Sequence, residues 1–268
     1  MKGKVFLVGA GPGALDLLTV RAVQLLQRAD VVLHDELVPH DFANLLRPTA
    51  IRLNVGKRCG KPGASQESIN ALMVRYAREG RRVVRLKCGD PSVFGRLGEE
   101  MDALREAGIQ FEVVPGVTAA FAAASAAQVS LTDRRIASRV VLAAGSLANN
   151  EQQDWGRCIE QKTTLVIYMP GRDYAVVAGN LLRAGADPDM PCAVVARAGA
   201  LDEEVRRTTV SKLPELSAAA SPSVLLIGEV VRSRQIWRVA AAALADDSDV
   251  RQQVWDQIAA EESPQHGI

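Results

Sequence analysis

Residues 86–96 read LKCGDPSVFGR, and this stretch decides how the whole chain is interpreted. The run before it, residues 82–87, is β-branched and alternating, which is typical of a strand, and residues 99–106 predict a helix. In an open α/β sheet, strand-to-helix turns at the carboxyl edge are where small molecules bind. We therefore predict an α/β fold in which residues 86–96 form a ligand loop.

Two more glycine loops also follow apolar, strand-like runs. They read VGAGPG at residues 8–13 and VPGVTAA at residues 114–120, and a further turn, VGKR, stands at residues 55–58. Glycine allows the backbone to approach a ligand closely. The sequence thus predicts three glycine loops on three strand ends.

Strands and helices alternate along the first half of the chain. We expect helices over residues 18–29, 41–47, 65–79 and 101–107, between strands at 5–8, 31–34, 51–54, 82–87 and 111–114. This alternation predicts a parallel five-stranded sheet with right-handed crossovers. In the second half the later strands are closer together, which favours a mixed sheet, with strands at 139–144, 164–169, 192–196, 205–209 and 224–231.

The domain organisation follows from these patterns. We predict an N-terminal α/β domain over residues 1–118, a C-terminal α/β domain over 119–234 and a helical tail over 235–268. Residues 113–132 carry no charge, but they contain Pro115 and Gly116 and are mostly alanine, too weakly apolar for a membrane span. We expect Thr118 to be the N-cap of a small-residue helix packed inside the protein or against a partner.

Composition narrows the class of protein. The chain has 268 residues, 48% of them apolar and 24% charged, with a net charge of +1, as in ordinary soluble proteins. This net charge rules out a strongly basic, phosphate-coating surface as the dominant feature, but it leaves a local basic patch open. The four cysteines form no C-x-x-C pair and only three histidines could join them, so we expect no metal site. Scattered cysteines and a strand directly at the amino terminus predict a cytoplasmic protein.

A dinucleotide-binding module is the alternative of a different class. Gly9, Gly11 and Ala14 satisfy the dinucleotide fingerprint, and Asp35 follows the second strand as a ribose-binding acid would. Pro12 opposes this interpretation because it removes a backbone donor where a pyrophosphate would rest. The first helix also starts after residue 17, too late for its dipole to serve that phosphate.

Together the four loops resemble those of the tetrapyrrole methylase family, from about residue 4 to about residue 231. The resemblance implies a two-domain α/β fold with the active site in the cleft between the domains, S-adenosylmethionine as methyl donor, and a homodimer. It is strongest to the branch that methylates uroporphyrinogen III at two ring carbons, C2 and C7, giving precorrin-2 through precorrin-1. A later precorrin methyltransferase of the same fold is the second possibility.

The resemblance also implies roles for individual residues. Asp35 matches the family's proton acceptor and Lys57 its proton donor, although Asp35 could simply cap a turn and Lys57 could pair with a substrate carboxylate. The alternative for Gly89 and Asp90 is that they simply form a turn, and the alternative for Met169 is that it only packs in the core. The positions that match the family's cofactor-binding residues are Pro12, Cys88, Gly89, Asp90, Val93, Thr118, Ala119, Met169 and Ala198.

Two of these positions, Cys88 and Ala198, replace glycines of the family pattern.

The substrate of the family carries many carboxylates, so its site needs several cations without a basic protein overall. Four candidates for these contacts are Arg58, Lys61, Arg96 and Arg134, and the alternative for any one of them is a solvated loop charge. Asp133 stands where close relatives often have histidine, and beside Arg134 it could neutralise that arginine.

Overall fold

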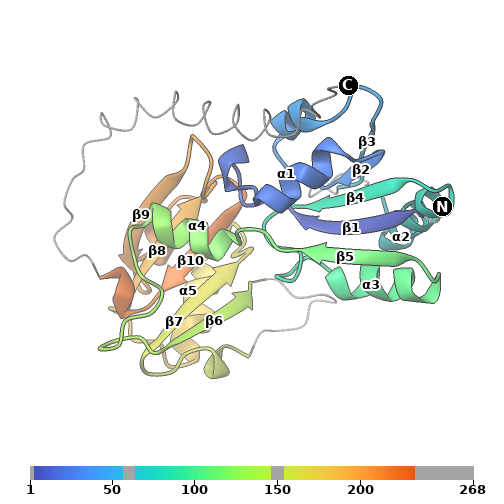
Figure 1. The fold of residues 1–268 in the computed structure, drawn as a ribbon. Coiled ribbons are helices and arrows are strands. Elements are labelled where there is room, and N and C mark those ends of the chain that lie inside the picture. The colour runs from blue at the N-terminus through green and yellow to red at the C-terminus, as the bar shows by residue number, and fades with distance from the viewer. Residues whose placement is uncertain (1–2, 57–63, 146–153, 233–268) are drawn as a thin grey trace. The chain divides into compact units, whose positions relative to one another are not determined.

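The computed structural model of the chain describes residues 3–56, 64–145 and 154–232. Residues up to Arg232 form one compact unit that contains two five-stranded sheets (Figure 1). The sheets lie on either side of the predicted boundary at residue 118, and the independence of the two halves stays a prediction.

The N-terminal sheet is entirely parallel, as predicted, with the strand order β3-β2-β4-β1-β5. Its strands are β1 (Lys4–Gly9), β2 (Val31–His34), β3 (Ile51–Asn54), β4 (Arg82–Lys87) and β5 (Gln110–Val114). Because β4 lies between β2 and β1, its residues from Val83 to Lys87 are all buried.

Helices cover both faces of this sheet (Figure 1). They are α1 (Val20–Gln27), α2 (Gln66–Arg78) and α3 (Leu97–Glu106). Alternate residues of β1 point into two cores: Phe6 packs in the core that contains α1, and Leu7 packs in the core that contains α2 and α3. The helix expected over residues 41–47 is a 3-10 helix over His40–Leu45.

The C-terminal sheet is mixed, as predicted, with the order β6-β7-β10-β8-β9. Only β6 and β7 pair in parallel. The strands are β6 (Arg139–Ala144), β7 (Thr163–Tyr168), β8 (Pro191–Ala196), β9 (Glu204–Thr209) and β10 (Ser223–Ile227). The strand predicted over 224–231 ends early because Gly228 adopts a φ of 142° and starts a 3-10 turn over Glu229–Val231.

Two helices belong to this second half. The helix α5 (Tyr174–Arg183) was not predicted, although Asp173 caps it by accepting from the backbone N–H groups of Ala175 and Val176. The alanine-rich helix α4 (Ala119–Ala126) packs in the core that contains Ala193 of β8. Within the described ranges, no helix is long and apolar enough to cross a bilayer.

Thr118 stands at the N-cap of α4, as predicted, but its side chain does not cap the helix. The Tyr168 hydroxyl accepts the N–H of Ala120 at 3.0 Å and lies 2.5 Å from Thr118 Oγ1. A side chain at the end of β7 therefore performs the capping. This contact joins the start of α4 to the second sheet.

Candidate active site

The three glycine loops meet at the carboxyl edge of the N-terminal sheet. Gly11 and Gly89 pair through two backbone hydrogen bonds, at 3.2 and 2.7 Å. A Cβ on Gly9 would lie 2.6 Å from the carbonyl oxygen of Gly89 and 2.7 Å from Cα of Gly116. These loops touch one another at distances that only glycine permits.

This geometry does not suit a dinucleotide pyrophosphate. Gly9 faces the other loops of its own chain, so its surface is not free for a phosphate. Helix α1 begins at Val20, two residues later than predicted, and its N-cap is Thr19. The amino end of α1 is therefore separated from the glycines whose phosphate it would have to stabilise.

Asp90 connects two of the loops. One carboxylate oxygen accepts the N–H of Gly116 at 2.9 Å, and the other accepts the N–H of Ser92 at 2.8 Å and its hydroxyl. Partial burial alone would raise the pKa of Asp90, but the hydrogen bonds from Ser92 and Gly116 outweigh it, and the pKa is lowered. The charged carboxylate of Asp90 thus fixes the conformation of the loop that contains Gly89 and Val93.

Cys88 fits its unusual position by turning into the protein. Its Sγ lies 4.0 Å from the carbonyl oxygen of Gly11, and the side chain packs against the core beside α1. Burial, assisted by the negative charge of Asp35, raises the pKa of this thiol to about 11. Cys88 is therefore neutral near pH 7 and acts as a small packing group.

The loop after β1 also reaches the loop after β8. The N–H of Ala14 donates to the carbonyl oxygen of Gly199 at 2.7 Å. A Cβ on Gly199 would lie 2.8 Å from Cγ of Pro12. The structure thus brings Pro12 beside the loop that begins with the buried Ala198.

The end of β7 also contacts the loop after β4. Met169 adopts a φ of 50° and leaves 51% of its surface exposed, so it is not a core filler. The ring of the preceding residue, Tyr168, lies 5.0 Å from the ring of Phe94, which follows Val93 in the loop after β4. The sequence analysis did not single out Tyr168, since a tyrosine at a strand end carries no distinctive signal.

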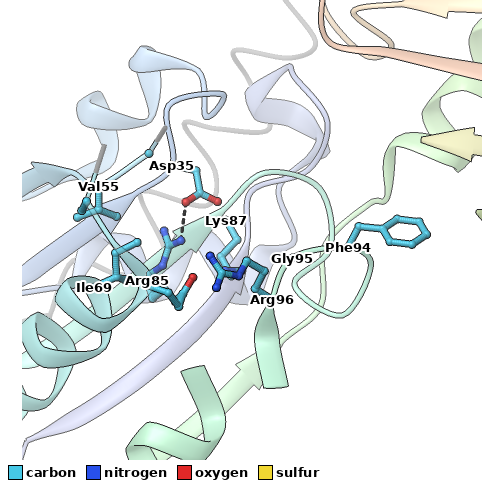
Figure 2. A pocket seen from close by; sticks show the side chains of 11 residues that line it. Asp35, Val55, Ile69, Arg85, Lys87, Phe94, Gly95 and Arg96 are labelled. Carbon is cyan, nitrogen blue, oxygen red and sulfur yellow. Dashed lines mark hydrogen bonds and ion pairs between the residues drawn. The ribbon is translucent and has the colours of Figure 1, made fainter. Parts of the chain in front are cut away.

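A pocket of about 210 Å³ opens beside these loops (Figure 2). Asp35 contributes a carboxylate to it, and Arg85, Lys87 and Arg96 contribute cations. Gly56 and Ala64, the described residues that flank residues 57–63, also line it. The remaining lining residues are Val55, Gln66, Ile69, Phe94 and Gly95.

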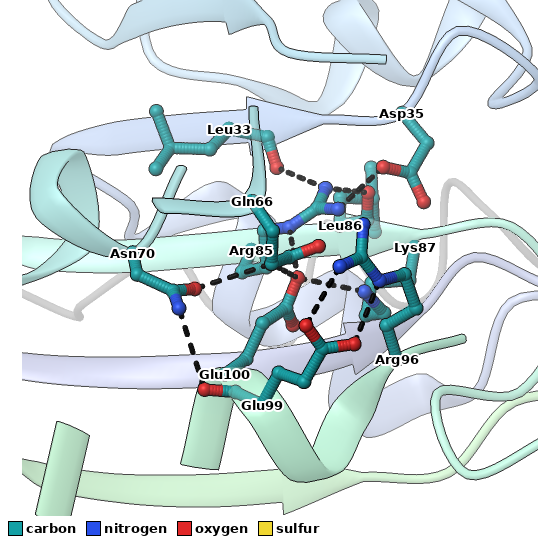
Figure 3. A network of polar contacts seen from close by, with 10 residues as sticks. All are labelled: Leu33, Asp35, Gln66, Asn70, Arg85, Leu86, Lys87, Arg96, Glu99 and Glu100. Atoms are coloured by element: carbon teal, nitrogen blue, oxygen red, sulfur yellow. Dashed lines mark hydrogen bonds and ion pairs between the residues drawn. The ribbon is translucent and has the colours of Figure 1, made fainter. Parts of the chain in front are cut away.

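A buried charge network lies beneath the pocket (Figure 3). Arg85 and Lys87 of β4 are each 3% exposed, and both donate to Oε1 of Glu100, at 3.0 and 2.8 Å. Arg85 also donates to Oδ1 of Asp35 at 2.5 Å. Burial and the charge of Arg85 lower the pKa of Lys87, against the opposing effect of Glu100.

This network was missed by sequence reasoning, but it had a signal. Residues 82–87 were assigned to a strand with helices on both sides, and cations in the middle of such a strand must be buried. A buried cation requires an anion within reach. Glu100 on α3 is that anion, and its side chain is fully buried.

The predicted substrate contacts have different surroundings. Arg96 lies at the pocket and is paired with Glu99 through two hydrogen bonds, at 2.7 and 2.6 Å. Arg134 is an exposed residue of the turn 133–137 and is outside the lining of this pocket. Asp133 accepts two hydrogen bonds from the side chain of Arg135, and its expected effect on Arg134 stays a prediction. Three other candidates, Lys57, Arg58 and Lys61, fall outside the described residues.

Comparisons with known proteins place this geometry among methylases. Residues 4–214 match the family of Tetrapyrrole (Corrin/Porphyrin) Methylases. A uroporphyrin-III C-methyltransferase from Thermus thermophilus, crystallised with S-adenosylhomocysteine, superposes with a TM-score of 0.75 at 38% identity, covering 86% of this chain and 94% of that one. A cobalt precorrin-4 methyltransferase superposes with a TM-score of 0.74 at 31% identity, covering 86% and 96%.

A curated relative is longer than this chain. Siroheme synthase 2 of Klebsiella pneumoniae is 44% identical over 234 residues, which cover 87% of this chain and 51% of the relative. The chain therefore spans about half the length of the curated relatives that it matches. The match over residues 4–214 and the agreement with two solved methyltransferases show that the chain belongs to the tetrapyrrole methylase family and is a methyltransferase.

Proposed function

We propose that the chain transfers methyl groups from S-adenosylmethionine to C2 and C7 of uroporphyrinogen III, giving precorrin-1 and then precorrin-2 plus S-adenosylhomocysteine. The observation that carries this proposal is the pocket in which Asp35 lies beside Arg85, Lys87 and Arg96. Arg96 is an exposed cation at this pocket, which suits a substrate rich in carboxylates, and the carboxylate of Asp35 suits a proton acceptor.

The convergent loops fit the methyl donor. They combine small residues, Gly89, Ala119 and Ala198, with the exposed side chain of Met169. Small residues leave room for a ligand beside the backbone, and methionine offers an adaptable apolar wall. We assign the donor to these loops with Pro12, Cys88, Asp90, Val93 and Thr118. The donor supplies a methyl group on a sulfonium, which is a good electrophile.

The chain's own residues then orient the substrate and accept its proton. The electron-rich ring carbon attacks the methyl group, so a carbon–carbon bond forms while the carbon–sulfur bond breaks. The substrate afterwards loses a proton, for which we assign Asp35 as the acceptor. We retain Lys57 as a proton donor, and Arg58, Lys61, Arg96 and Arg134 as ligands of substrate carboxylates. The expected homodimer also remains part of the proposal.

A direct assay tests the proposal. The purified protein is incubated anaerobically with uroporphyrinogen III and methyl-labelled S-adenosylmethionine, and the label and mass of the tetrapyrrole are followed. We expect two methyl groups per substrate. Absent transfer, with S-adenosylhomocysteine still bound, would contradict the proposed substrate and favour a later precorrin, whereas a single transfer would contradict the second methylation. Such a substrate is the second candidate because the 31% identical precorrin-4 methyltransferase has nearly the same fold.

A further inference from the structure

We propose that Glu100 is a positioning residue for the reaction, because it holds Arg85 in the orientation that fixes the carboxylate of Asp35. This inference rests on the proposed function, in which Asp35 accepts the substrate proton. Glu100 itself is not among the residues that line the pocket. It would therefore act through Arg85 and not by contact with the substrate.

Arg85 is held on several sides. Its Nε donates to Glu100 Oε1 at 3.0 Å, and its Nη1 faces the carbonyl oxygens of Leu33 at 3.4 Å and Leu86 at 3.3 Å. Its Nη2 donates to Asp35 Oδ1 at 2.5 Å (Figure 3). With these acceptors in place, the guanidinium has little freedom to follow a substrate. Its main contact toward the pocket is Asp35.

Asp35 depends on this contact for its orientation. Its backbone N–H donates to the carbonyl oxygen of Leu86 at 3.1 Å, which ties the residue to β4. The side chain remains 28% exposed, and within the described part of the chain Oδ1 is held by Arg85. A carboxylate fixed through one oxygen can present the other to the pocket.

The two carboxylate oxygens of Glu100 have different surroundings. Oε1 accepts from Arg85, from Lys87 at 2.8 Å and from Gln66 Nε2 at 3.3 Å. Oε2 is buried and has no hydrogen-bond partner among the described residues. An orphan buried oxygen is costly, so a carboxylate used only to stabilise the fold would be expected to engage both oxygens. The arrangement instead concentrates the negative charge where Arg85 and Lys87 meet.

The charges of the network also depend on one another. Arg85 contacts both Glu100 and Asp35, and Lys87 contacts Glu100. Without Glu100, the two buried cations would be left with Asp35 as the only anion of the network, and Arg85 would lose the acceptor that orients it. Buried ionic groups are often no more stabilising than apolar residues of the same size, so stability alone does not account for this cluster.

The test is a double-mutant cycle between Glu100→Gln and Asp35→Asn. Single-turnover transfer of labelled methyl gives the rate, KM for the tetrapyrrole is measured separately, and calorimetry gives the affinity for S-adenosylhomocysteine. We expect Glu100→Gln to lower kcat about 10- to 100-fold, within the range for general-base catalysis, with both KM and affinity within about twofold. In the Asp35→Asn background, Glu100→Gln should change the remaining rate by less than about twofold.

The matched control is Asp102→Asn, which removes a negative charge from the exposed face of the same helix. Asp102 is exposed and pairs with the exposed Arg105, so its replacement should leave kcat unchanged. An equal loss from Glu100→Gln in both backgrounds would overturn the inference, because a structural defect does not depend on Asp35. If Glu100→Gln does not fold, as judged by circular dichroism, the cycle is run with Gln66→Leu, which loosens Glu100 but keeps every charge.

The proposed function and the inference can fail separately. Absence of methyl transfer by the unmodified protein would contradict the function. Methyl transfer that survives Asp35→Asn would leave the function standing and overturn the positioning role. For Gln66→Leu we expect a smaller fall in kcat that again disappears in the Asp35→Asn background, and a loss independent of Asp35 would overturn the inference.

Discussion

The two sheets bury different kinds of side chain. Among the described residues, the buried charged groups all belong to the N-terminal half, namely Arg85, Lys87 and Glu100. The core between α4 and the C-terminal sheet is instead built from alanines, valines, leucines and Tyr168. In the proposed function, the first sheet supplies the charged groups for chemistry, and the second supplies small-residue walls for a ligand.

The largest expected effect tests whether the chemistry resides in the N-terminal sheet. Asp35→Asn should lower kcat about 100- to 10,000-fold, because it removes the proposed proton acceptor and keeps its shape. Affinity for S-adenosylhomocysteine, measured by calorimetry, should stay within about twofold. Unchanged turnover would remove the catalytic role of Asp35 and, with it, the functional distinction between the sheets.

The next effect is on stability. Arg85→Met leaves Glu100 and Asp35 without their shared partner, and we expect it to lower the free energy of unfolding by about 3–5 kcal/mol. Urea denaturation measures this value. Arg105→Met, on the exposed surface of α3, serves as the control and should change it by less than about 1 kcal/mol. Similar values for the two variants would contradict the buried network.

A smaller effect is expected in the C-terminal half. Tyr168→Phe removes the hydroxyl that accepts the N–H of Ala120 and contacts Thr118. The loss should be about 1–2 kcal/mol of unfolding free energy, since a helix cap and one buried hydrogen bond disappear. Tyr76→Phe, on α2, provides a control for the same chemical change. Equal losses in the two tyrosine variants would show that Tyr168 does not cap α4.

Thr164→Val should have the opposite sign. Thr164 is fully buried in β7, and its hydroxyl has no hydrogen-bond partner among the described residues. Replacing it with valine removes an unsatisfied polar group at nearly constant volume, so stability should stay the same or rise by up to about 1 kcal/mol. Thermal unfolding measures this change. A clear loss would show that the hydroxyl makes a contact that stabilises the sheet.

The smallest effect concerns acid stability. The pKa of Asp90 is lowered from its ordinary value of 3.8, so its charged form stabilises the folded state. This contribution is complete well above that value and is lost as the pH falls through the lower folded-state pKa. Asp90→Asn should therefore flatten the decline in stability below about pH 4. Thermal unfolding temperatures from pH 7 to pH 3 test this, and parallel declines in both proteins would contradict it.

Much of the fold followed from patterns that are local in sequence. The apolar runs of the first sheet lie where strands form, and the helix expected over residues 65–79 forms as α2, which Ser65 caps by accepting the N–H of Ser68. Two elements that differ from the prediction also have local causes in the sequence, but their apolar composition obscured these causes. Helix α5 has a capping aspartate but an apolar composition, and β10 ends at a glycine within an apolar run.

The amino-acid sequence by itself determined the alternation of strands and helices, the parallel first sheet and the positions of the three glycine loops. These features depend on residue spacing and on glycine chemistry, which act over a few neighbours. Only the tertiary structure decided which charges pair. Arg85 meets Asp35 across 50 residues of chain and Glu100 across 15, and such contacts depend on the packing of α3 against the sheet. The same packing places two basic residues of a strand at the base of a charged pocket, because a buried charge requires a partner of opposite charge.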